Sequence, residues 1–153
     1  MNKSTYRKIE HYLYNYNFIE IQIDNLKAEL KDSEFNQNYT RYIKNKSSSL
    51  EDLIINNDNI NQRINKILKW QELISEVLDY YRQNDKLKHK YIVLKYFNRV
   101  KQYKILKCLE LSFEEEQDIQ SEILEYIFFI AVQKNMLKGG NDAETIINTN
   151  TKI

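Results

Sequence analysis

The chain of 153 residues contains no proline, and its only two glycines are the adjacent residues Gly139 and Gly140. Proline removes a backbone donor and clashes with the preceding helical turn, while glycine destabilises a helix through the freedom of its unfolded backbone. Residues 1–138 therefore lack the two residues that most strongly interrupt helices. This feature predicts an all-α protein without strands. A chain of this length can bury one core, or form a helical hairpin beside one small domain.

Apolar residues recur every seven positions in the first part of the chain, from Thr5 to about Lys31. This repeat is typical of a coiled-coil-like stripe on one long helix. The two rows of the stripe are Ile9, Tyr16, Ile23 and Leu30, and Tyr12, Ile19 and Leu26. We therefore predict a single helix over this range. A loop is expected at residues 33–49, where the repeat is lost and Ser and Asn gather.

A second repeat follows Ser48 and Ser49, which precede Glu51 and Asp52 by three residues each, as in a capping box. The rows of this repeat are Leu53, Ile60, Ile67, Ile74 and Tyr81, and Leu50, Asn57, Ile64, Gln71 and Leu78. The two polar members of the second row either fix register and partner or form an exposed fringe. Three large apolar residues lie off these rows and predict a second packing surface: Trp70, Leu73 and Val77.

Residues 1–83 are therefore predicted to form a long helical hairpin. We expect Ile64 and Ile67 to be buried against Ile19 and Ile23, or against the same rows of a second chain. In the second case the N-terminal helices would form a homodimer.

Residues 84–140 are predicted to form a three-helix unit, and residues 141–153 a flexible tail. Asn84, followed by Asp85, can cap the first of these helices. We expect that helix to end at about Phe97.

The other two helices of this unit have the start and stop signals of a helix-turn-helix. The first covers roughly Val100–Leu109 and is followed by a three-residue break at Glu110–Ser112. Ser112 and Glu115 have the spacing of a capping box, which opens the last helix. We expect this helix to run to Leu137 and to stop at the glycine pair.

Charges are segregated in this region, although the formal net charge of the chain is only +1. Residues 85–107 carry one acid, Asp85, and eight basic residues: Lys86, Lys88, Lys90, Lys95, Arg99, Lys101, Lys104 and Lys107. Residues 109–125 carry no base and seven acids: Glu110, Glu114, Glu115, Glu116, Asp118, Glu122 and Glu125. The sequence predicts a basic stripe followed by an acidic helix.

A basic stripe over two helices is what contact with nucleic-acid phosphates requires, because neutralising phosphates releases counterions. The alternative is a solvated face that complements the acidic helix. On the first interpretation, the residues that contact double-stranded DNA are Lys95, Arg99, Lys101, Lys104 and Lys107. The acidic residues expected to contact a protein partner are Glu114, Glu115, Glu116 and Asp118. Carboxylates at a helix start also complement the helix dipole, which is the simpler explanation for them.

The side chains that usually carry catalysis or bind metals are scarce. Cys108 is the only cysteine, and His11 and His89 are the only histidines, so no zinc-site spacing exists. Neither a glycine-rich phosphate loop nor a catalytic triad can be identified. We expect no enzymatic activity and no cofactor, and a location in the reducing cytoplasm of a bacterial cell. The longest apolar run, residues 126–132, is shorter than the about 20 residues that a membrane span needs.

Two segments resemble a family of transcriptional regulators of Gram-positive phages, the ArpU-like and RinA-like late activators. In YIVLKYF, residues 91–97, the family's Leu-[Arg/Lys]-Tyr core is matched by Leu94, Lys95 and Tyr96. In ILKCLELS, residues 105–112, the matching positions are Ile105, Leu109, Leu111 and Ser112. The C-terminal half of this family resembles the promoter-reading region 4 of sigma factors. The resemblance implies a phage- or prophage-encoded regulator that binds promoter DNA, host RNA polymerase, or both.

The chain departs from this family's pattern at the positions that would read DNA. Leu106 stands where a small residue is expected, and the serine is followed by Phe113, Glu114, Glu115 and Glu116 in place of basic and polar residues. Base recognition needs hydrogen-bond donors at the start of the second helix. We therefore expect a degenerate helix-turn-helix, sigma-region-4-like in fold. The alternative function is a helical protein-interaction module, dimeric or bound to a host factor, that does not bind DNA.

Overall fold

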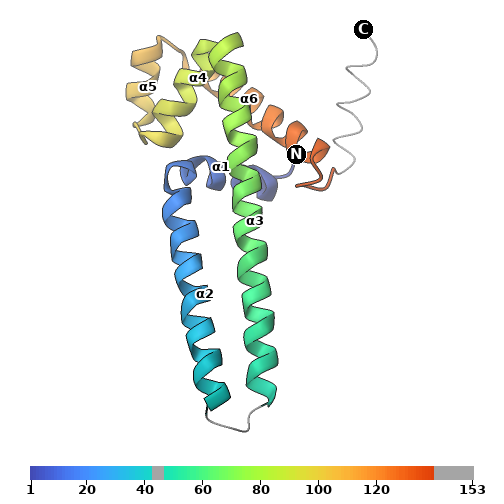
Figure 1. Ribbon diagram of the computed structural model, residues 1–153. Coiled ribbons are helices and arrows are strands. Elements are labelled where there is room, and N and C mark those ends of the chain that lie inside the picture. Colours follow the sequence, from blue (N-terminus) through green and yellow to red (C-terminus); the bar gives the residue numbers. More distant parts are fainter. Residues whose placement is uncertain (43–46, 140–153) are drawn as a thin grey trace. The chain divides into compact units, whose positions relative to one another are not determined.

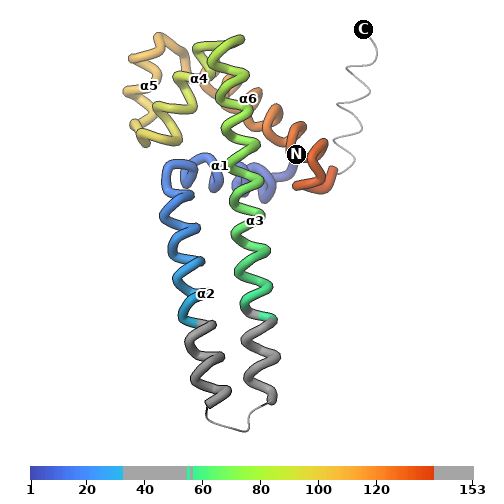
Figure 2. Tube along the Cα trace, viewed as in Figure 1, coloured from blue at the N-terminus to red at the C-terminus, as the bar shows by residue number. Residues whose placement is uncertain are grey.

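The computed structural model describes residues 1–42 and 47–139, with the side chains of 33–42, 47–54 and 56 left out. Figure 1 shows the helices, and Figure 2 marks in colour the residues whose side chains are described. In chain order the elements are α1 (Lys3–Tyr14), the 3-10 turn η1 (Tyr16–Phe18), α2 (Ile19–Tyr42), α3 (Ser47–Asn84), α4 (Lys86–Ile92), the π-helical segment η2 (Val93–Phe97), α5 (Gln102–Leu109) and α6 (Phe113–Gln133). No strand occurs within the described residues, and the predicted all-α class is confirmed there.

The single helix predicted from Thr5 to Lys31 is wrong, because the chain leaves the helix at Asn15. There the backbone N–H and the side-chain Nδ2 of Asn15 both donate to the carbonyl oxygen of His11, at 3.1 and 2.7 Å. An asparagine that bonds to a nearby carbonyl competes with continuation of the helix. The loop predicted over residues 33–49 is also wrong in part, since α2 continues to Tyr42 and α3 begins at Ser47.

The chain groups into two compact units. One comprises Asn17–Gln71, and the other combines Met1–Tyr16 with the chain from Glu72 onward. This division differs from the predicted one, in which residues 1–83 formed the first domain, because α1 contacts α6 and η2. The predicted tail at 141–153 lies outside the described residues.

The unit Asn17–Gln71 buries apolar residues from both predicted stripes. Its buried members on the two stripes are Ile19, Ile23, Leu26, Ile60 and Ile64. Ile67, which we expected to be buried beside Ile64, is only half-buried. Asn57 buries its side-chain oxygen without a hydrogen-bond partner among the described atoms. Leu50, Leu53 and the predicted caps near Ser48 lie outside the described side chains.

The other unit has a core to which α1, α3, α4, η2, α5 and α6 all contribute. Its buried apolar residues include Ile9, Leu13, Leu73, Ile74, Val77, Tyr91, Ile92, Tyr96, Ile105, Ile123, Leu124 and Ile127. Leu73 and Val77 of this unit, and Trp70 of the unit Asn17–Gln71, are at most 1% exposed, as expected if these off-row residues form a second packing surface of α3.

Two predictions for the C-terminal helices are corrected, the cap of α4 and the end of α6. Asp85 rather than Asn84 caps α4, accepting a hydrogen bond from the Lys88 backbone at 3.2 Å. Beyond Ile92 the chain continues to Phe97 as the π-helical η2. The end predicted for α6 at Leu137 is wrong, because α6 ends at Gln133. Asn135, with φ of 57°, adopts the left-handed conformation that usually terminates helices.

The difference in burial along α3 predicts different outcomes for two of its leucines. Leu73→Ala should lower the free energy of unfolding by about 2–5 kcal/mol, because Leu73 is 0% exposed and its loss leaves a cavity. Leu68→Ala makes the same chemical change at a residue that is 43% exposed, and should change the free energy of unfolding by about 0.5 kcal/mol or less. Urea unfolding followed by circular dichroism measures both. Equal losses would show that the assigned burial of α3 is wrong.

Candidate functional site

The connection between α5 and α6 is a three-residue turn. It consists of Glu110, Leu111 and Ser112, as predicted, and Glu110 is left-handed with φ of 55°. The Leu111 backbone N–H donates to the carbonyl of Leu106 at 2.9 Å. The predicted capping box is present, since the Ser112 hydroxyl accepts from the Glu115 N–H at 3.1 Å and the Glu115 carboxylate accepts from the Ser112 N–H at 3.0 Å. These contacts fix the residue at which α6 begins.

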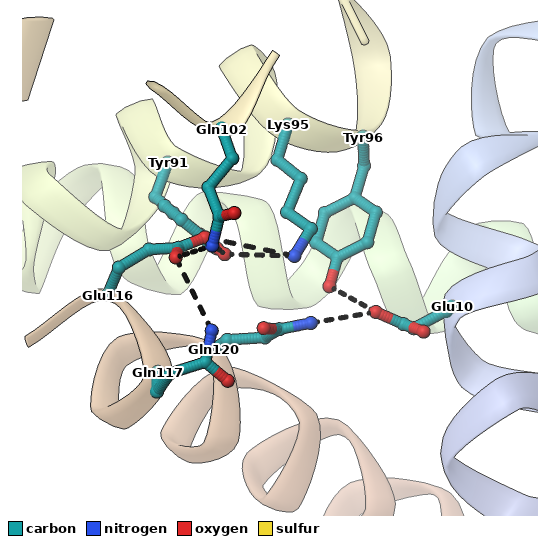
Figure 3. A network of polar contacts seen from close by, with 8 residues as sticks. All are labelled: Glu10, Tyr91, Lys95, Tyr96, Gln102, Glu116, Gln117 and Gln120. Atoms are coloured by element: carbon teal, nitrogen blue, oxygen red, sulfur yellow. Dashed lines mark hydrogen bonds and ion pairs between the residues drawn. The ribbon is translucent and has the colours of Figure 1, made fainter. Parts of the chain in front are cut away.

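A buried carboxylate lies one turn inside α6. Glu116 is 1% exposed, and Figure 3 shows the polar side chains around it. Its Oε1 accepts from the Tyr91 hydroxyl at 2.9 Å, and its Oε2 accepts from Nε2 of Gln102 at 2.6 Å. Gln117 Nε2 makes a longer contact at 3.4 Å, and Lys95 Nζ lies 4.0 Å from Oε1. Glu116 therefore joins α4, η2, α5 and α6 through one side chain.

A second carboxylate extends this network to α1. Glu10 Oε1 accepts from the Tyr96 hydroxyl at 3.0 Å and from Nε2 of Gln120 at 2.9 Å, as Figure 3 shows. Tyr96 is on η2 and Gln120 is on α6, one turn beyond Glu116. The polar network thus holds three separate parts of the sequence together: the N-terminal helix, the segment from α4 to α5, and α6.

Burial perturbs the titration of this network. The pKa values of Tyr91 and Tyr96 are raised above 10.0 by burial, with neighbouring Glu116 and Glu10 adding to the effect. The pKa of Lys95 is lowered below 10.5, because burial disfavours its charged form more than Glu116 and Glu10 favour it. Lys95 Nζ donates to the Tyr91 hydroxyl oxygen at 3.2 Å. A chain of donors therefore runs from Lys95 through Tyr91 to Glu116.

The residues predicted to contact DNA fall into two groups. Lys101, Lys104 and Lys107 are exposed on or beside α5, and no carboxylate of the described residues forms an ion pair with them. Lys95 differs, because its side chain is only 18% exposed and lies beside Glu116. Arg99 is exposed, is left-handed with φ of 51°, and places its guanidinium 5.6 Å from the ring centroid of Tyr14.

The residues predicted to contact a protein partner are also divided. Glu114, Glu115 and Asp118 are exposed at the start of α6. Glu116 is buried, so the prediction that it contacts a protein partner on the acidic surface is wrong. Its position was available in the sequence, because Glu116, Gln120, Ile123 and Ile127 recur with the spacing of one helix face, and all four are buried.

The basic stripe does in part complement the acidic helix. Lys88 Nζ lies 2.6 Å from Glu122 Oε2 on α6 and 3.3 Å from Asp85 Oδ2, and Lys95 lies beside Glu116. Sequence reasoning missed Gln102 and Glu10 as network members, because Gln102 bonds to Glu116, 14 residues away, and Glu10 bonds to Gln120, 110 residues away.

A pocket of about 330 Å³ lies at one side of this network. Its lining residues are Tyr14, Lys95, Arg99, Val100, Gln102, Ile105 and Glu116. In the described part of the chain, no group of three or more His, Cys, Asp or Glu side chains could hold a metal ion. None of the described helices is long and apolar enough to span a membrane.

Comparison of the chain with models of protein families, with curated proteins and with solved structures finds no match. The resemblance to phage late activators therefore stays a prediction, and the geometry of the site is the basis for assigning a function.

The raised pKa values predict how stability depends on pH. Tyr81, Tyr91 and Tyr96 have folded pKa values above their usual 10.0, so the unfolded chain loses these protons first. Their contribution to stability is complete below pH 10 and is lost as the pH rises further. The contribution of Lys95 to the pH dependence of stability has the opposite sign, since its lowered pKa makes folding slightly more favourable as the pH approaches 10.5. We expect the free energy of unfolding to fall above about pH 10, measured by urea titration at each pH.

Tyr96→Phe should reduce that fall, because it removes one of the three buried ionisable hydroxyls. Tyr103→Phe is the matched control, since Tyr103 is 63% exposed. An alkaline fall of equal steepness in wild type and Tyr96→Phe would contradict the role given to the buried tyrosines.

Proposed function

We propose that the chain is a small transcriptional regulator of the phage type, which binds duplex DNA through α5 and has no catalytic activity. The observation that carries this proposal is the row of exposed lysines, Lys101, Lys104 and Lys107, directly before the capped turn into α6. Host RNA polymerase is the proposed protein partner, and the bacterial cytoplasm is the proposed location.

The geometry of α5 suits contact with a phosphate backbone. Residues three and four apart lie on the same side of a helix, so Tyr103, Lys104 and Lys107 share one face. Ile105 is buried on the opposite side. Lysines without a carboxylate partner keep their charge available for phosphates, and each contact releases a counterion from DNA. The network around Glu116 holds α5 in place through Gln102.

The start of α6 is poorly suited to reading bases. Its exposed side chains include Glu114, Glu115 and Asp118, which repel phosphates. The two candidate donors are Gln117 and Gln120, and both make hydrogen bonds within the network, to Glu116 and Glu10. We therefore assign DNA affinity to α5 and propose that promoter choice depends on a second protein.

A second candidate function is a protein-interaction module that does not bind DNA. The observation that favours it is the exposed side chain of Phe113, at 59%, next to the exposed acids of α6. An apolar side chain beside carboxylates is suited to a basic protein surface with an apolar centre. Such a surface could serve a host factor in place of DNA, or polymerase in addition to DNA.

The first candidate predicts steeply salt-dependent duplex binding. Lys101→Glu with Lys104→Glu should abolish or severely weaken binding to a labelled duplex. The negative slope of log affinity against log salt should become less steep by about two. Fluorescence anisotropy across a salt series at fixed pH measures both quantities. Reversal of the charge of two phosphate-contacting lysines also adds repulsion, so the loss should be largest at low salt.

Lys66→Glu with Lys69→Glu is the matched control, because it makes the same charge change at two exposed residues of α3. This variant should keep wild-type duplex affinity within about twofold, since neither lysine is on α5. Equal losses of duplex affinity in both variants would show that binding depends on the net charge of the protein and not on the α5 lysines. A wild-type protein that binds no duplex at the lowest salt would remove the first candidate and leave the interaction module.

A further inference from the structure

The pocket beside Glu116 is the strongest unassigned feature of this unit. Figure 3 shows three of its lining side chains, Lys95, Gln102 and Glu116, within the polar network. Its volume of about 330 Å³ falls in the lower part of the range of small-molecule sites. Arg99 and Gln102 are exposed residues, so the pocket is open to solvent.

Lys95 has hydrogen-bonding capacity that the described residues do not use. An ammonium group has three N–H donors, and among the described residues Lys95 Nζ has one acceptor, the Tyr91 hydroxyl at 3.2 Å. The nearest carboxylate oxygen, on Glu116, is 4.0 Å away and therefore beyond hydrogen-bond distance. Lys95 Nζ lies 5.6 Å from the ring centroid of Tyr91 and 5.5 Å from that of Tyr96, and these rings compensate the ammonium charge only in part. A cation that is 18% exposed and incompletely paired is stabilised by an incoming anion.

Arg99 supplies a second cation to the same pocket. It follows Asn98, the cap residue of η2, and its left-handed conformation, with φ of 51°, is the one that terminates a helix. Its guanidinium rests over the ring of Tyr14, and its Nη2 donates to the Tyr14 carbonyl at 3.4 Å. A guanidinium carries five donors in a planar fork that matches two oxygens of a phosphate.

Glu116 leaves the pocket suitable for an anion, although it lines the wall. Its oxygens already accept hydrogen bonds from Tyr91, Gln102 and Gln117. Two cations and one carboxylate among the lining residues leave one net positive charge. The remaining wall is formed by the apolar side chains of Val100 and Ile105 and by the ring of Tyr14, which can contact an organic group attached to the anion.

We infer that this pocket binds a phosphate group, as inorganic phosphate or as a phosphate monoester, between the side chains of Lys95 and Arg99. The phosphate can come from a free phosphorylated molecule or from a nucleic-acid backbone. The inference goes beyond duplex binding by the α5 lysines and does not depend on it.

The test uses the full chain and measures binding of inorganic phosphate and of adenosine monophosphate by isothermal titration calorimetry at constant ionic strength. Adenosine, which lacks the phosphate, is the ligand control and should not bind. Arg99→Asn should weaken both phosphate ligands about tenfold or more, because it removes charge-assisted hydrogen bonds. Asparagine tolerates the left-handed conformation, so this variant should fold as wild type does, which thermal unfolding checks.

Lys95→Gln is the second variant and should show the same loss. Lys90→Gln, at an exposed lysine outside the pocket, should bind phosphate as wild type does. If inorganic phosphate competes with duplex and Arg99→Asn weakens both, the bound group is a backbone phosphate. If duplex binding is unchanged, it is a free phosphorylated molecule. The inference is overturned if wild type binds neither phosphate ligand, or if a folded Arg99→Asn binds both as tightly as wild type.

Discussion

The burial of one carboxylate is the constraint on which the C-terminal helices depend. Glu116 is 1% exposed, and a buried ionised carboxylate is tolerated only when donors surround it. These donors come from Tyr91 on α4 and from Gln102 on α5, with Lys95 on η2 nearby. If any of these elements moved away, the Glu116 carboxylate would lose a donor. The carboxylate therefore specifies one arrangement of α4, η2, α5 and α6.

This arrangement separates two surfaces of opposite charge along a short length of chain. The lysines of α5 point away from buried Ile105, and the exposed acids of α6 begin directly after the capped turn. Lys88 and Lys95 pair with acids of α6, Glu122 and Glu116 respectively. The basic stripe thus has an inner part that holds the fold and an outer part, Lys101, Lys104 and Lys107, that carries the proposed contact with DNA.

Local signals in the sequence predicted the features that depend on neighbouring residues. The missing proline predicted the all-α class, and the Ser112–Glu115 spacing predicted the start of α6, because a cap and its helix lie within one turn. The break at Asn15 and the end of α6 near Asn135 were missed, since an asparagine can either continue a helix or end it. The pairing of Glu10 with Tyr96 and Gln120 could not be predicted, because it joins residues 86 and 110 positions apart through tertiary packing.

The central claim is that the Glu116 carboxylate, through its buried donors, holds this unit together, and a double-mutant cycle with Tyr91 tests it most directly. Tyr91→Phe removes only the hydroxyl, and Glu116→Met replaces the carboxylate by an apolar group of similar length. The free energies of unfolding of wild type, both single variants and the double variant are measured in urea. We predict that Tyr91→Phe costs about 1.5–3 kcal/mol more in wild type than in the Glu116→Met background, as expected for a buried hydrogen bond to a charged group. Equal costs in the two backgrounds would contradict the claim.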